Sequence, residues 1–110
     1  MHSEWIFDQI NTLKIEKKIN LLDFASGNGR NCIPLSNKNI IVTAIDKDQE
    51  KLNLYKSLSN INTICFDLET KEEWPLVKEY YDIIIEASAM AQYSQDINNL
   101  GNDAYALHAV

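Results

Sequence analysis

Four short apolar runs, each followed by turn-forming or polar residues, constrain the fold of this chain most strongly. The runs are Ile19–Ala25, Ile40–Ile45, Ile61–Phe66 and Tyr81–Ile85. Runs of this length are typical of strands buried on both faces of a sheet. We therefore expect four buried strands, joined by segments long enough to cross from one strand to the next.

The segments around these runs carry helical patterns. Apolar spacing predicts an amphipathic helix over residues 4–14 and another over Asp48–Leu58. A further helix is expected to begin near Gly29 and to be limited by Pro34, since proline is tolerated only in the first turn. Residues 87–97 also favour a helix.

Alternating strand and helix patterns predict βαβ crossovers and a parallel sheet, so the expected fold class is α/β. The chain of 110 residues is long enough for one domain, over residues 1–110. Residues 70–79 are expected to form a loop, and Gly101 is expected to end the helix before it. Residues 102–110 give no clear signal.

Gly27 and Gly29 stand in the turn that follows the first run, and the whole chain contains three glycines. Glycine permits a positive φ and lets a ligand approach the backbone closely. The amino end of the following helix would offer unpaired N–H groups to an anionic group. The alternative is a turn that needs glycine only to change direction.

Asp46 ends the second run, near the spacing of about 20 residues at which nucleotide-binding folds place an acidic residue on the ribose hydroxyls. We interpret Asp46 as a ribose ligand, with helix capping as the alternative. A dinucleotide would need a third glycine where Cys32 stands. That residue disfavours a nicotinamide dinucleotide.

Asp67 and Leu68 follow the third run and offer a carboxylate, a backbone N–H and an apolar side chain, which suit the edge of an adenine ring. In open α/β sheets such ligands bind beyond the carboxyl ends of the strands. The alternative is an exposed acidic turn over Asp67–Glu73, with Trp74 and Leu76 tucked into the core.

Composition excludes several other functions. A formal net charge of −6 repels phosphate backbones, so we expect no nucleic acid partner. No apolar run approaches the ~20 residues of a membrane span. Residues 1–5 lack the basic start and the apolar stretch of a secretory signal, so we expect none. Cys32 and Cys65 lie far apart and outside metal-type spacing, which predicts a reduced cytoplasmic protein without a metal site.

Four motifs in order carry a resemblance to a known family. They are Asp23-Phe-Ala-Ser-Gly-Asn-Gly-Arg30, Val42-Thr-Ala-Ile-Asp46, Asp67-Leu-Glu69 with Trp74-Pro-Leu76, and Tyr81-Asp-Ile-Ile84. Together they resemble motifs I to IV of class I S-adenosylmethionine-dependent methyltransferases, over about residues 3–86. They are similar, more narrowly, to small bacterial methyltransferases with an Ala-Cys-Gly-x-Gly-Arg turn, in which Ser26 replaces the cysteine.

The resemblance implies S-adenosylmethionine as the cofactor and a small-molecule methyl acceptor. Asp23 and the backbone from Ala25 to Gly29 would hold the methionine moiety, and Asp46 the ribose. Asp67 and Leu68 would contact the adenine, with Lys47 beside it, and the residues after strand four would line the pocket near the methyl group. The implied cofactor-binding residues are Asp23, Ala25, Ser26, Gly27, Gly29, Asp46, Lys47, Asp67, Leu68, Glu86 and Ala87.

The resemblance also implies a Rossmann-like three-layer α/β/α fold with about four strands in the order 3-2-1-4, short of the family's seven. Strand four would then be an open edge, and such edges pair with other chains. We therefore expect a homo-oligomer in which strand four or residues 87–110 complete the sheet. Glu86 and Tyr93 are candidate bases by location only, with helix capping or packing as the alternative, so no catalytic residue is assigned.

The function expected first is that of a small-molecule methyltransferase. The second hypothesis is a half-domain that binds S-adenosylmethionine or S-adenosylhomocysteine without transferring a methyl group. A nicotinamide-dinucleotide domain is the third.

Overall fold

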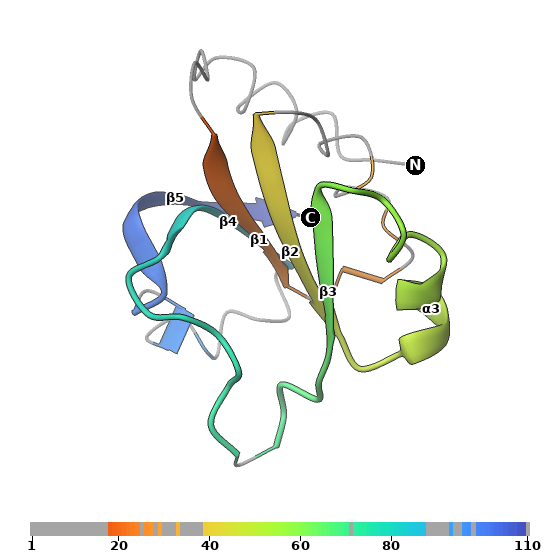
Figure 1. The fold of residues 1–110 in the computed structure, drawn as a ribbon. Helices are drawn as coiled ribbons and strands as arrows, with labels where there is room; N and C mark the ends of the chain where they lie inside the picture. Colours follow the sequence, from red (N-terminus) through yellow and green to blue (C-terminus); the bar gives the residue numbers. More distant parts are fainter. Residues whose placement is uncertain are drawn as a thin grey trace.

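The computed structural model describes residues 18–24, 26–27, 29, 33, 39–70, 72–87, 93, 96–97 and 99–109. These residues form a five-stranded sheet in the order β3-β2-β1-β4-β5, and each neighbouring pair is parallel (Figure 1). The elements are β1 (Ile19–Phe24), β2 (Ile40–Asp46), α3 (Gln49–Asn53), β3 (Ile61–Cys65), β4 (Tyr81–Ala87) and β5 (Gly101–Ala109). The α/β class and the order of the four predicted strands are confirmed.

Strand β5 extends the sheet beyond the sequence prediction. Gly101, which we expected to end a helix, begins this strand and pairs with Tyr81 of β4. The edge of β4 that we expected to be open is therefore covered by the same chain. Among the described residues, β5 is now the edge strand on this side of the sheet, and β3 is the edge strand on the other (Figure 1).

Buried apolar side chains lie on both faces of the sheet, because successive residues of a strand point to opposite sides. We call the two groups the first and second core clusters. The first contains Leu21, Ile40, Val42, Ala44, Leu52, Tyr55, Ile61, Ile83 and Ile85. The second contains Leu22, Phe24, Ile45, Leu68, Tyr81, Ile84, Ile97 and Leu100. The expectation of a sheet covered on both faces is confirmed for β1, β2 and β4. It is wrong for β3, because this edge strand buries Ile61 and exposes Asn62 and Cys65.

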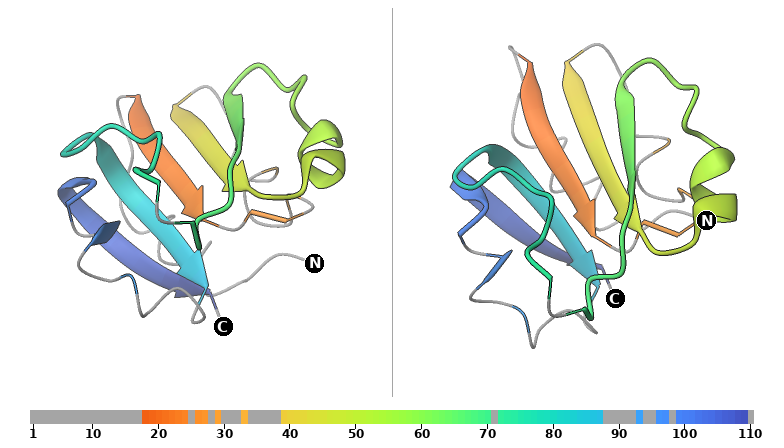
Figure 2. Two further views of the ribbon diagram at one scale, coloured as in Figure 1. Left: turned by 90° about the horizontal axis from the view of Figure 1, so that it is seen from below. Right: turned by 60° about the horizontal axis from the view of Figure 1, so that its bottom comes forward.

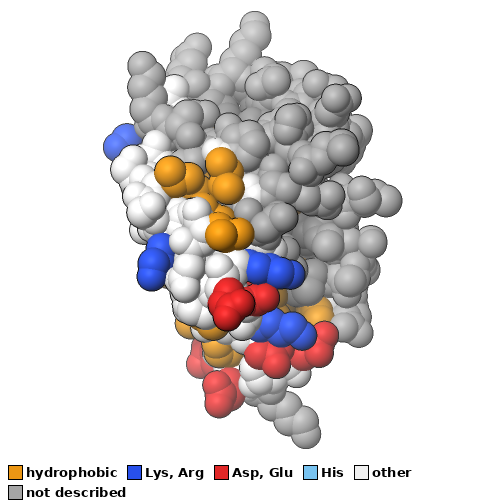
Figure 3. Space-filling view, turned by 90° about the vertical axis from the view of Figure 1, so that its right-hand side faces the viewer, with side chains coloured by type: hydrophobic (Ala, Val, Ile, Leu, Met, Phe, Trp, Pro, Cys, Tyr) orange, Lys and Arg blue, Asp and Glu red, His pale blue; other side chains and the backbone are white. Residues whose placement is uncertain are grey.

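Helix α3 is shorter than predicted and covers the face of the first core cluster. After Asn53 the tighter i→i−3 bonds appear, since the Leu54 N–H donates to the Lys51 carbonyl at 3.1 Å, while the Lys56 N–H still bonds the Leu52 carbonyl in the α-helical pattern at 3.0 Å. Leu52 is buried as expected, whereas Leu58 is 40% exposed, so its predicted inward position is wrong. Figure 3 shows the side of the molecule that carries α3, where basic and acidic side chains lie intermixed beside a few hydrophobic ones.

The segment between β3 and β4 is irregular, as predicted for residues 70–79, and it covers the face of the second core cluster (Figure 2). The predicted helix over residues 4–14 lies outside the described residues. Of the helix expected near Gly29, Ile33 is described and is helical. Of residues 88–97, three are described, and Asp96 and Ile97 are helical. Within the described ranges, no helix is long and apolar enough to cross a membrane.

Candidate functional site

The turn after β1 is held against β2 by backbone hydrogen bonds. The Ser26 N–H donates to the Ile45 carbonyl at 3.1 Å, and the Gly29 N–H donates to the Ser26 carbonyl at 3.1 Å. Gly27 has φ +57° and Gly29 has φ +86°, so both occupy the region that glycine adopts without strain. The predicted need for glycine in this turn is confirmed.

The two glycines serve different purposes. A Cβ atom at Gly29 would lie 2.7 Å from the side chains of Ile33 and Tyr55, so Gly29 is required for packing. A Cβ atom at Gly27 would meet none of the described residues within 4 Å. Gly27 therefore leaves an open approach to the backbone at the carboxyl end of β1.

The Asp46 carboxylate ties this turn to the end of β2. Its Oδ2 accepts the Gly27 N–H at 2.8 Å and its Oδ1 accepts the Asp48 N–H at 2.9 Å. A carboxylate has about four acceptor positions, so about two remain for further donors. The alternative that Asp46 caps the following helix is wrong, because the N-cap of α3 is Asp48, whose carboxylate accepts from the N–H groups of Glu50 and Lys51.

The Tyr55 side chain is hydrogen-bonded to the turn after β1, and Tyr55 was not predicted as a site residue. Its hydroxyl lies 2.6 Å from Ser26 Oγ and donates to the Gly27 carbonyl at 3.0 Å. Tyr55 is 1% exposed and Ser26 is 6% exposed, so these bonds are shielded from water. The only sequence signal was a tyrosine on the buried side of the predicted helix, since a buried hydroxyl needs a partner.

The end of β3 lies next to Asp46, because the Phe66 N–H donates to the Asp46 carbonyl at 3.0 Å. Lys47 is exposed, and its carbonyl accepts from Cys65 Sγ at 3.5 Å. Asp67 is exposed, and its Oδ1 accepts the N–H of Glu69 at 3.0 Å. The structure thus brings the ends of β1, β2 and β3 together, as the sequence predicts.

Leu68 and Trp74 form the other part of this region. Leu68 is 8% exposed and packs in the second core cluster, and its carbonyl accepts the Trp74 indole N–H at 3.3 Å. Trp74 and Leu76 pack against the same cluster. The inward packing of these two side chains, which belonged to the alternative interpretation of this turn, is confirmed, and Leu68 presents little of its side chain to a ligand.

The remaining predicted residues are placed as follows. Asp23 is 3% exposed and stands in β1 between Ala44 of β2 and Ile85 of β4. Ala25 lies outside the described residues. Glu86 and Ala87 end β4, paired with β5, beyond the position level with Asp23. Tyr93 packs its ring edge-on against Trp74, with centroids 5.7 Å apart, as the packing alternative predicts.

The family model of the tellurite resistance protein TehB matches residues 1–102, almost the whole chain. The chain belongs to the TehB family. No curated protein sequence matches it.

This TehB-family chain is similar to several solved structures, and we report three of them. A methyltransferase from Aquifex aeolicus, described as SAM-dependent, matches with a TM-score of 0.68 and 19% identity, over 91% of this chain and 60% of the other. A putative methyltransferase of an antibiotic biosynthesis pathway from Anabaena variabilis matches with a TM-score of 0.77 and 16% identity. The match covers 96% of this chain and 44% of the other. A TehB-like SAM-dependent methyltransferase from Corynebacterium glutamicum matches with a TM-score of 0.69 and 19% identity. The match covers 92% of this chain and 59% of the other.

These similarities confirm the Rossmann-like fold of class I methyltransferases for this TehB-family chain. The chain spans 60% or less of the length of these three structures.

Proposed function

We propose that this chain is an S-adenosylmethionine-dependent methyltransferase that acts on a small molecule. The observation that carries the proposal is the Asp46 carboxylate, which is bonded to the N–H of Gly27, keeps acceptor capacity and stands beside an open backbone. Membership of the TehB family supports the same function.

In this proposal Asp46 accepts hydrogen bonds from the ribose hydroxyls. Asp23 and the backbone from Ala25 through Ser26 and Gly27 to Gly29 hold the methionine moiety. Lys47, Asp67 and the backbone of Leu68 contact the adenine, and Glu86 with Ala87 lines the region of the methyl group. The cofactor would supply a methyl group already activated on a sulfonium, so the chain's own contribution is to bind, orient and exclude water.

The acceptor is proposed to be a small molecule, because the chain carries a net charge of −6 and the described face around α3 mixes both signs of charge (Figure 3). A nucleic acid partner would need a basic surface. We also propose a cytoplasmic location, in keeping with cysteines that show no disulfide-type pattern.

Titration calorimetry with S-adenosylmethionine and S-adenosylhomocysteine tests the proposal. Asp46→Asn should weaken binding about 10- to 100-fold, the value of a hydrogen bond to a charged group. Asp48→Asn is the matched control, because it removes the same charge two residues away and asparagine is an equally good N-cap. Equal affinity of the two folded variants would refute the assignment of Asp46.

The alternative is a binding half-domain without transferase activity, which the short length relative to the three solved structures favours. Release of S-adenosylhomocysteine with a panel of small acceptors separates the two. A binding module would retain micromolar affinity and release no product, whereas an enzyme would release it. Stabilisation by NADH instead would indicate the nicotinamide-dinucleotide domain.

We further propose a homo-oligomer that forms through residues 87–110. We expect the outer edge of β5, and not that of β4, to pair with a second copy of the chain, since no described strand covers the outer edge of β5. Light scattering at micromolar concentration should give at least twice the mass of 12.6 kDa. A monomer would refute the assembly and leave the cofactor proposal untouched.

A further inference from the structure

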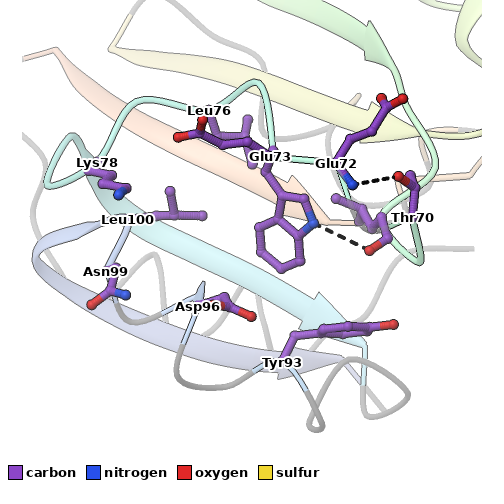
Figure 4. A pocket seen from close by; sticks show the side chains of 11 residues that line it. Thr70, Glu72, Glu73, Leu76, Lys78, Tyr93, Asp96, Asn99 and Leu100 are labelled. Atoms are coloured by element: carbon purple, nitrogen blue, oxygen red, sulfur yellow. Dashed lines mark hydrogen bonds between the residues drawn. The ribbon is translucent and has the colours of Figure 1, made fainter.

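A pocket of about 320 Å³ lies on the face of the sheet that carries the second core cluster, apart from the glycine turn. It is lined by the segment between β3 and β4 and by described residues that precede β5, and it is open on one side (Figure 4). None of Ser26, Gly27 and Asp46 lines it, although Leu68, whose backbone is proposed to contact the adenine, does. The volume is at the lower end of the range for small-molecule sites, about 300–1,000 Å³, so a ligand here would be small.

One side of the pocket is an aromatic wall formed by Trp74 and Tyr93. The Trp74 indole is held by its bond to the Leu68 carbonyl at 3.3 Å and lies between two rings. Its centroid is 5.5 Å from that of Phe24 and 5.7 Å from that of Tyr93. Leu76, which is half-buried, adds aliphatic surface. A half-buried tryptophan with a hydrogen-bonded indole N–H provides a surface for an apolar or cationic group.

The charged side chains of the pocket are mainly acidic. Among the described lining residues, Glu72, Glu73 and Asp96 are acidic and Lys78 alone is basic, although Figure 4 shows the Glu72 carboxylate directed away from Asp96. Figure 4 shows Asp96 between the end marked by Lys78 and Leu100 and the end marked by Tyr93. This excess of negative charge beside an aromatic wall disfavours an anion and attracts a cation.

We propose that this pocket binds a small organic cation, an amine that carries an aromatic or alkyl group. The hydrocarbon part packs against Trp74 and Leu76, which are half-buried, and the ammonium group lies within reach of the ring face and of the Asp96 carboxylate. An ammonium group gains from both an aromatic face and a carboxylate, whereas a neutral ligand would gain only from the hydrocarbon surface. The proposal does not depend on cofactor binding at the glycine turn.

Titration calorimetry with two probes of equal shape tests the charge requirement. Phenethylamine and 2-phenylethanol share the same hydrocarbon and differ in the ammonium group. The amine should bind about fivefold or more tightly, since cation–π and ion-pair contributions add. Equal affinity for the two probes, or no saturable binding of the amine, would overturn the proposal.

Two variants with the same charge change test the location. Asp96→Asn should weaken amine binding about three- to fivefold, the range of an exposed ion pair, and should leave the affinity for the alcohol unchanged. Glu50→Gln is the matched control, because Glu50 stands on α3, whose buried Leu52 packs on the opposite face. Equal effects of the two variants would show that the amine is attracted by the net charge of the protein and not by Asp96, which would overturn the site.

A competition experiment separates this pocket from the proposed cofactor site. S-adenosylhomocysteine at saturation should leave the amine affinity unchanged. Displacement of the amine would show that the two ligands share one site, against the proposal.

The variant Lys78→Gln should have the opposite effect on amine binding to that of Asp96→Asn. It removes the one basic side chain among the described lining residues, so it should tighten amine binding. Weaker binding by this variant would contradict the assigned electrostatics.

Discussion

Replacement of Tyr55 by phenylalanine is the sharpest test of how the candidate site is supported. The substitution keeps the ring, which packs beneath Gly29, and removes only the hydroxyl. That hydroxyl lies 2.6 Å from Ser26 Oγ and 3.0 Å from the Gly27 carbonyl oxygen. The variant therefore probes two hydrogen bonds at the glycine turn with little change in shape.

The magnitude follows from the burial of these groups. A net hydrogen bond contributes about 0.5–1.5 kcal/mol, and a buried polar atom that loses its partner costs about 1–3 kcal/mol. Because Ser26 is 6% exposed, we expect Tyr55→Phe to lower the free energy of unfolding by about 2 kcal/mol. Ser26→Ala should lower it by about 1 kcal/mol, and the double variant should cost less than the sum, because both single changes remove the same contact.

Urea denaturation followed by far-ultraviolet circular dichroism measures these changes. With an m-value of about 1–3 kcal/mol per molar urea, a loss of 2 kcal/mol moves the midpoint down by about 1–2 M. Tyr80→Phe is the matched control, because Tyr80 is 46% exposed, and its effect should stay within about 0.5 kcal/mol. Additive single changes, or a Tyr55→Phe effect no larger than that of the control, would refute the reasoning.

Three further predictions concern the same framework. Gly29→Ala should destabilise the fold by about 2–4 kcal/mol, since its Cβ would clash with Tyr55, whereas Gly27→Ala should cost about 1–2 kcal/mol from its positive φ alone; similar urea midpoints for the two would contradict the packing argument. Asp48→Ala should cost about 1 kcal/mol in thermal or urea unfolding, with Asp48→Asn nearly neutral, as an N-cap requires. Burial raises the pKa of Tyr81, so the free energy of unfolding should be level below about pH 10 and fall above it; Tyr81→Phe should abolish this decline, and an unchanged slope would exclude Tyr81 as its source.

The sequence alone was enough to predict strands β1 to β4 and their parallel arrangement. The inner strands β1, β2 and β4 are mostly apolar, because burial on both faces requires apolar residues at successive positions, whereas the edge strand β3 buries Ile61 and exposes Asn62 and Cys65. The positions of Gly27 and Asp46 at neighbouring strand ends were predictable for the same reason. Parallel strands place their carboxyl ends at one edge of the sheet, so consecutive turns meet there.

Strand β5 was decided only by the tertiary structure. The apolar run of residues 101–109 is limited to Ala104–Leu107 and is half alanine, which is depleted in strands, and Gly101 suggested the end of a helix. Pairing with β4 supplies the hydrogen bonds that make this segment a strand, from Gly101 beside Tyr81 to Ala109 beside Ala87. Edge strands are specified more by their neighbour than by their own composition.

The partners of individual side chains were also beyond the sequence. Tyr55 stands 28 positions from Gly27 and bonds to its carbonyl, and Asp46 bonds to the turn while Asp48 caps the helix. The aromatic pocket around Trp74 likewise depends on how the segment between β3 and β4 and the described residues that precede β5 pack over the sheet. Local patterns record which residues favour strand, turn or cap, whereas these contacts arise from the distances that the folded chain sets between remote positions.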